Sequence, residues 1–206
     1  MEHPYRKFYL LPLYALCLLL PLPAVGAAGT RPPAGSVSLE NSTVSGRHCA
    51  TGADAARLED GQVYLQASLR GVAETKFSMK KARAMCAWVV HLKIPPGWQA
   101  GLAKVEGRVQ KNLDPAVKGV AEASGWYGAG GPRGRVKMQW QGPAAGNAPL
   151  GGALDKTVWS PCGGGKPLRI QASVRVNNRK AAGASGTIEM DALKAGLVWR
   201  PCQGKP

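Results

Sequence analysis

One five-residue phrase occurs twice in the last third of the chain, and this repeat most constrains the fold. Residues 158–162 read Val-Trp-Ser-Pro-Cys, and residues 198–202 read Val-Trp-Arg-Pro-Cys. Between them, residues 168–176 place an apolar side chain at every second position. This alternation is typical of a half-buried β-strand, because successive side chains of a strand point to opposite faces of the sheet. The pattern predicts a sheet whose two ends are joined by a disulfide between Cys162 and Cys202.

Shorter alternating segments recur along the chain and are separated by glycine and proline turns. The expected strands cover residues 37–39, 62–70, 87–94, 103–109, 119–127, 135–140, 187–190 and 197–199. No segment shows an amphipathic helical period, and residues 141–152, rich in Pro, Gly and Ala, are expected to form a loop. Together these features predict an all-β fold, an antiparallel β-sandwich or open barrel that two disulfides hold together.

The N-terminus is typical of a secretory signal peptide. Two basic residues at 6–7 precede an apolar run over 8–20, and small residues follow at 25–28. The apolar run is shorter than the roughly 20 residues that a membrane-spanning helix needs. We therefore expect cleavage after Ala27 or Ala28, no membrane span afterwards, and a secreted protein, extracellular or, in a two-membrane bacterium, periplasmic.

The chain is accordingly expected to have three parts. These are a signal peptide over 1–27, a flexible leader over 28–46 that carries a short edge strand, and a single secreted β-domain over 47–206. The leader includes Asn41-Ser42-Thr43, which matches the acceptor sequence for N-linked glycosylation. This match matters only if the host glycosylates its secreted proteins.

Four cysteines remain once the signal peptide is removed: Cys49, Cys86, Cys162 and Cys202. An even number in an exported chain predicts two disulfides, although four cysteines allow three pairings. The repeated phrase favours Cys162–Cys202, brought together by an antiparallel return between residues 168–176 and 197–199, and leaves Cys49 with Cys86. There is no Cys-x-x-Cys pair, so neither a zinc site nor any other metal or cofactor is predicted.

The strongest feature of the composition is positive charge. The chain has 27 Lys and Arg against 12 Asp and Glu, a formal net charge of +15. Such a protein is attracted to anionic polymers, although the same charge can simply keep the wet faces of a β-protein soluble. The sequence contains no nucleic-acid recognition motif, so the expected partner is an anionic polysaccharide or another cell-surface polymer rather than a specific nucleic acid. The oligomeric state stays open.

Four basic residues are the candidates for anion binding because they alternate outward on two predicted strands: Arg135, Lys137, Arg169 and Arg175. A second cluster, formed by Lys80, Lys81 and Arg83, falls in the segment 76–83, where a solvated connection between strands is expected. Charge reversal of the first set is therefore predicted to weaken binding more than charge reversal of the second.

Six tryptophans could pack in the core or stack on a sugar. A tryptophan at an alternating position usually packs inside, so four of the six are expected in the core. Trp98 and Trp126 lie beside predicted turns and are expected to be exposed.

Residues suited to catalysis are few, and none is assigned a catalytic role. Only His48 and His91 remain in the mature chain, which leaves little room for a Ser-His-Asp arrangement. Glu189 and Asp191 form the best carboxylate pair, since two residues of a strand spaced by two share one face. The sequence thus favours a non-enzymatic binding or surface module. The alternative is a secreted hydrolase that acts on an acidic or carbohydrate polymer.

Several short motifs, in this order, resemble a family of secreted proteins known as domain of unknown function 4360. They are Cys86 with the following Pro96-Gly97-Trp98, Gly107-Arg108, Ser160-Pro161-Cys162-Gly163, Leu168-Arg169-Ile170-Gln171 with Arg175-Val176, and Trp199 three residues before Cys202. The chain departs from the family in having His48 and Ala50 around the first cysteine and Met85 before the second. The resemblance implies a secreted, disulfide-bonded β-domain and no particular activity.

Overall fold

A computed structural model describes residues 31–50, 56–73, 81–179 and 183–203. These residues form eleven strands and no helix, and no membrane-spanning helix is found among them. The all-β prediction is therefore confirmed for this part of the chain. The predicted signal peptide lies outside the described residues.

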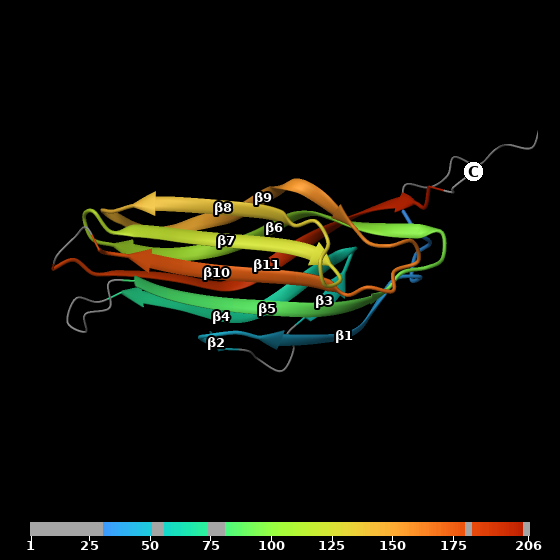
Figure 1. Cartoon of the computed structure of the whole chain (residues 1–206), viewed down its shortest axis with the longest axis horizontal. Helices are drawn as coiled ribbons and strands as arrows, with labels where there is room; N and C mark the ends of the chain where they lie inside the picture. Colours follow the sequence, from blue (N-terminus) through green and yellow to red (C-terminus); the bar gives the residue numbers. More distant parts are fainter. Residues whose placement is uncertain (1–30, 51–55, 74–80, 180–182, 204–206) are drawn as a thin grey trace, which may run out of the picture.

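The strands form two antiparallel sheets that pack face to face as a sandwich (Figure 1). Sheet A has the order β1 (Ser38–Ser45), β5 (Lys81–Lys93), β10 (Leu168–Asn177), β7 (Lys118–Tyr127) and β8 (Gly134–Gln141). Sheet B has the order β2 (Cys49–Ala50), β4 (Gln62–Ala73), β11 (Gly186–Pro201), β6 (Trp98–Leu113) and β9 (Ala144–Trp159), and β3 (Ala56–Glu59) pairs with β4.

The core lies between the sheets and is built by the alternation that the sequence shows. In β10, every second side chain from Leu168 to Val176 is buried, and β4 buries every second side chain from Val63 to Leu69 in the same way. Trp88 of β5 is 1% exposed and belongs to the same cluster. Burial of a large apolar side chain stabilises a fold by about 1.5–3 kcal/mol, so these inward faces hold the two sheets together.

The segment predicted as a loop over 141–152 belongs mostly to the sixteen-residue strand β9, so that prediction is wrong. Its backbone pairs with β6, although the segment offers few of the β-branched side chains that identify a strand. Leu150 and Leu154 of β9 are buried and fix the strand to the core. Since β9 is the last strand of its sheet, Pro149 is tolerated there.

The leader is also more ordered than the sequence suggests. Strand β1 extends over Ser38–Ser45 and pairs with β5 at the edge of sheet A, whereas only residues 37–39 were expected to be extended. Half-buried Leu39 and Val44 pack against the core, which explains why this polar segment joins the sheet.

Both predicted disulfides are present. The Cα–Cα distance is 5.3 Å for Cys49–Cys86 and 5.6 Å for Cys162–Cys202. The antiparallel return expected between residues 168–176 and 197–199 is wrong, because β10 and β11 belong to different sheets. The repeated phrases instead end β9 and β11, the two strands that flank β6, and this shared neighbour brings the two cysteines together.

Candidate anion-binding site

Basic side chains gather on the outer face of sheet A at the end where β5 begins and β10 ends. Arg175 of β10 lies opposite Arg83 of β5, and Asn177 lies between Lys81 of β5 and Lys118 of β7. These residues face outward because the intervening positions on each strand point into the core. The register of three strands thus brings together cations that are far apart in the sequence.

We call the cations around the first hollow at this end the basic shelf: Lys81, Lys118, Lys137 and Arg175. The hollow has a volume of about 230 Å³, and Val120, Gln139 and Asn177 complete its lining. No carboxylate is among these lining residues. Lys81, Lys118 and Lys137 are exposed and Arg175 is half-buried, so the charges face water.

A second hollow of about 810 Å³ adjoins the first, and Lys81 lines both. Its described lining includes four cations and one imidazole and no carboxylate: Arg47, Arg70, Lys81, Arg83 and His48. The two hollows therefore form one continuous basic region at this end of the sandwich.

The segment that carries Arg47 into the second hollow is fixed in place. The Met85 backbone N–H donates to the Arg47 carbonyl over 2.9 Å, and the Cys49–Cys86 disulfide lies next to this contact. Gly46 has φ +152°, and a Cβ at this position would lie 1.9 Å from the Met85 carbonyl oxygen. Only glycine permits this close approach of the two backbones.

The carboxylates nearest this region already have partners. Glu122 lies opposite Lys137 across β7 and β8 but forms its ion pair with Arg135, with an Nε–Oε1 distance of 3.7 Å. Glu189 pairs with Arg70. Within the part of the chain that the structure describes, none of the four shelf cations forms a salt bridge. An anion that binds here would relieve the repulsion among them.

All four predicted anion-binding residues lie on the outer face of sheet A, but they do not form one cluster. Lys137 and Arg175 belong to the basic shelf, and Arg135 is paired with Glu122. Arg169 lies six residues from Arg175 along β10, about 20 Å away, and opposite Trp126. Two of the four predicted residues, Lys137 and Arg175, are therefore shelf residues.

The remaining shelf residues were missed. Of the second predicted cluster, Lys81 and Arg83 belong to β5 rather than to a connection, and Lys80 lies outside the described residues. Lys81 lines the shelf, and Arg83, in the second hollow, is the direct cross-strand neighbour of Arg175. Lys118 begins β7. The distinction between the two predicted basic sets therefore does not hold in space, and the missing signal was the strand order that puts β10 between β5 and β7.

The tryptophans offer no open stacking platform on this face. Trp126 is 9% exposed, and the Arg133 guanidinium carbon lies 4.2 Å from the ring centroid. The predicted exposure of Trp126 is therefore wrong, because the arginine covers the ring. Trp98 is half-buried and packs against the core.

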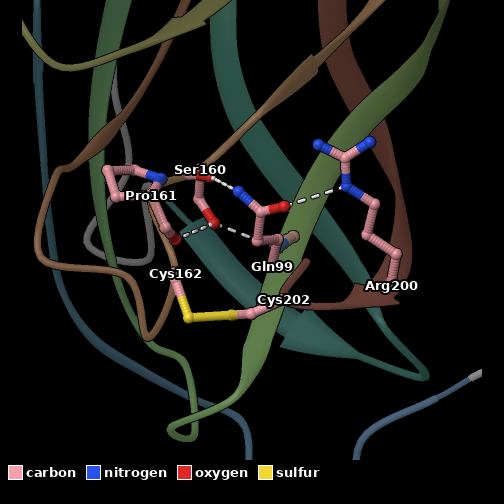
Figure 2. Close-up of a disulfide and its surroundings, with 7 residues drawn as sticks. Gln99, Ser160, Pro161, Cys162, Arg200 and Cys202 are labelled. Carbon is pink, nitrogen blue, oxygen red and sulfur yellow. Dashed lines mark hydrogen bonds between the residues drawn. A yellow bond between two sulfur atoms is a disulfide. The ribbon is translucent and has the colours of Figure 1, made fainter. Parts of the chain in front are cut away.

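At the opposite end of the molecule, polar side chains surround the Cys162–Cys202 disulfide (Figure 2). Arg200 Nε donates to Gln99 Oε1 over 2.9 Å, and Gln99 Nε2 donates to the Ser160 carbonyl over 2.6 Å. The Arg200 guanidinium carbon also lies 3.9 Å from the ring centroid of Trp159. These contacts join β6, β9 and β11, and they give the Arg200 guanidinium partners within the fold.

Each carboxylate of the predicted pair Glu189 and Asp191 contacts a side chain of the neighbouring strand β4. A β-bulge in β11 lies between Met190 and Ala192, and Glu189 and Asp191 each contact a different residue of β4. Glu189 pairs with Arg70, and Ser68 Oγ donates to Asp191 Oδ1 over 3.1 Å. Among the residues described, no group of three His, Cys, Asp or Glu side chains could hold a metal ion.

Comparison with known sequences identifies a family and a relative. The family model described as "Domain of unknown function (DUF4360)" matches residues 35–202. An uncharacterized secreted protein of Arthroderma benhamiae is 25% identical over 191 residues, which cover 88% of this chain and 78% of the relative. The predicted secretion is confirmed by this likeness.

Comparison with solved structures returns carbohydrate-binding modules at low similarity. TmCBM61 in complex with β-1,4-galactotriose has 15% identity and a TM-score of 0.29, with 80% of this chain and 91% of that chain covered. TmCBM27, a module for mannan recognition, has 7% identity and a TM-score of 0.30, with 81% and 99% covered. TM-scores this low support no statement about a ligand.

Proposed function

The chain belongs to the DUF4360 family, and we propose that this secreted member is a binding module for anionic polymers, with the basic shelf at the centre of its site. The single observation that carries the proposal is the shelf itself, whose four cations share one hollow without a carboxylate among the lining residues. A cluster of like charges destabilises a folded protein, so its presence on a regular sheet face favours a role in binding.

The shape of the region favours a polymer over a single small anion. The two hollows meet at Lys81 and extend from sheet A to β4 of sheet B. A ligand that fills both needs anionic groups at regular intervals along a chain, as in a polysaccharide that carries carboxylates or sulfates. Several weak contacts on one chain then add up, because each contact after the first is intramolecular.

The mode of recognition is electrostatic. The ring of Trp126 is covered by Arg133, and the described lining of the two hollows contains no Trp, Tyr or Phe. Binding should therefore weaken as salt is added, because exposed charges are screened over about 8–10 Å at physiological ionic strength.

A pair of triple variants tests the proposal. One carries Lys81→Glu, Lys118→Glu and Lys137→Glu in the shelf. The matched control carries Lys93→Glu, Arg108→Glu and Lys156→Glu, three exposed positions outside the two hollows with the same change in net charge. We expect the shelf variant to raise the Kd for heparin or polygalacturonate by about 3- to 150-fold, since three exposed ion pairs of about 0.2–1 kcal/mol each are lost. The control should change the Kd much less.

Two outcomes would overturn the proposal. If the unaltered protein does not bind either polymer, or if both triple variants lose affinity equally, the shelf is not a binding site and only total charge matters. Incubation of each polymer with the protein, followed by measurement of new reducing ends, tests the alternative hydrolase. We expect none to form, because Glu189 is paired with Arg70 and Asp191 accepts a hydrogen bond from Ser68 Oγ.

A further inference from the structure

The glycosylation acceptor sequence Asn41-Ser42-Thr43 lies on β1, away from the basic region. It is the one Asn-x-Ser/Thr sequence in the 206 residues. Asn41 is exposed, whereas Ser42 and Val44 are half-buried on the core side of the strand. A sugar on Asn41 would therefore extend into solvent without displacing any core side chain, as an N-linked site requires.

Strand β1 is an edge of sheet A, and none of the described strands pairs with its outer side. It forms the lower border of the molecule in Figure 1, next to β5. From Asn41 to Ser45 it pairs in regular register with β5, and this stretch contains neither a proline nor a charged residue. Such an edge presents unpaired backbone groups that can pair with a second chain, and natural proteins usually block it.

Other edge strands of the sandwich carry their own protection. Edge strand β9 contains Pro149 and glycines with positive φ at 146, 151 and 152. Edge strand β8 presents the charged side chains Arg135 and Lys137. In β1 a bulge between Leu39 and Asn41 and the exposed Glu40 interrupt one part of the edge, whereas residues 41–45 have neither device.

We propose that Asn41 carries an N-linked glycan, and that this glycan covers the open β1 edge of sheet A. In the transfer, Asn41 Nδ2 forms a bond with the anomeric carbon of the sugar and loses one proton. The bond that breaks joins this carbon to the diphosphate of an activated glycosyl donor, and the diphosphate leaves. The host's transferase and glycosyl diphosphate donor supply the reaction.

The glycan leaves the basic shelf accessible. Asn41 lies opposite His91, which is ten residues from Lys81 along β5, or about 33 Å. The inference therefore does not depend on the proposed polymer binding, and either can fail without the other.

Secretion of the full chain from a eukaryotic host tests the modification. Treatment of the secreted protein with a glycosidase that removes N-linked glycans should lower its mass by one glycan. Thr43→Ala and Asn41→Gln should abolish this shift, whereas Thr43→Ser keeps the acceptor sequence and should preserve it. Secreted protein that shows no shift, or a shift that Thr43→Ala retains, would overturn the assignment of Asn41.

Light scattering at increasing concentration tests the role at the edge. An endoglycosidase that leaves one sugar on Asn41 creates no carboxylate there. Protein trimmed in this way has folded with the glycan in place, and it should self-associate more than the fully glycosylated protein. Thr43→Lys lacks the acceptor sequence but places a charge on the edge, so it should stay monomeric without a glycan. Equal self-association of the fully glycosylated and trimmed proteins would refute the protective role.

Discussion

The two ends of the sandwich contain similar side chains in different surroundings. At the end closed by Cys162–Cys202, Arg200 hydrogen-bonds Gln99 and lies over Trp159. At the other end, Arg175 lies among Lys81, Lys118 and Lys137 and has no salt bridge within the described residues. The comparison shows that residue type does not distinguish a cation that stabilises the fold from one that can bind a ligand. What distinguishes the two is whether the cation already has a partner within the protein.

Each end also has its own disulfide, so mutation of one bridge at a time can test the difference between the ends. The Cys162–Cys202 bridge fixes the ends of β9 and β11, and the Cys49–Cys86 bridge lies beside the segment that brings Arg47 into the second hollow. One bridge therefore supports a region in which Arg200 has partners within the fold, and the other supports a region rich in cations, of which Arg70 is paired with Glu189.

The largest effect is expected from removal of either bridge. Cys162→Ala with Cys202→Ala, or Cys49→Ala with Cys86→Ala, should each lower the free energy of unfolding by about 4 kcal/mol, because the bridges span similar separations of 40 and 37 residues. Urea unfolding measures the loss. The two double variants should also differ in polymer binding, since only the loss of the Cys49–Cys86 bridge should weaken it. Equal loss of binding in both double variants would contradict the division between the ends.

A smaller effect should distinguish two arginines. Arg200→Ala removes a hydrogen bond from a charged group and a cation–π contact, which together contribute about 1–2 kcal/mol to stability. Arg175→Ala removes only a cation from a repulsive cluster and should change stability by less than about 0.5 kcal/mol. Urea unfolding of the two variants checks this order, and a larger loss for Arg175→Ala would reverse it.

The smallest effect concerns Tyr127, near the disulfide-closed end of β7. Burial raises the pKa of Tyr127 well above its ordinary value of 10.0, and its hydroxyl has no hydrogen-bond partner among the described residues. The unfolded chain ionises this group from about pH 10 while the folded chain keeps it neutral, so stability should fall above pH 10 by up to about 1.4 kcal/mol per pH unit.

Tyr127→Phe removes this contribution. Its stability should be close to that of the unaltered protein at pH 7, because a buried hydroxyl without a partner contributes little or is unfavourable. At pH 11 the variant should be more stable by about 1 kcal/mol. Urea unfolding at both pH values gives the difference, and an identical alkaline loss in both proteins would show that other groups cause it.

The strands with large apolar side chains could be predicted from the sequence, because burial imposes their alternation directly. Trp88 in β5 and the buried side chains of β10 are examples. Strand β9 could not, because Gly, Ala and Pro give little alternating signal and the strand depends on its partner β6. The disulfide pairing followed from two matched phrases, although the strand between them, β10, does not pair with β11 as expected.

Only half of the basic shelf, the candidate site, could be predicted from the sequence, for a related reason. Outward orientation is a property of one strand, so Lys137 and Arg175 could be recognised from alternation. Proximity is a property of strand order, which sequence periodicity does not encode. Lys81 and Lys118 enter the shelf because β10 lies between β5 and β7, and no local pattern reveals that arrangement.

The strand order also determines when the molecule can fold. β10 lies in the middle of sheet A and β11 in the middle of sheet B, yet these two strands come last along the chain. Sheet A cannot be completed until residues up to 177 have left the ribosome, and sheet B until residues up to 201 have done so. Non-local pairing of this kind is slow. The earlier strands of this secreted chain therefore lack their central partners until nearly the whole sequence has been made.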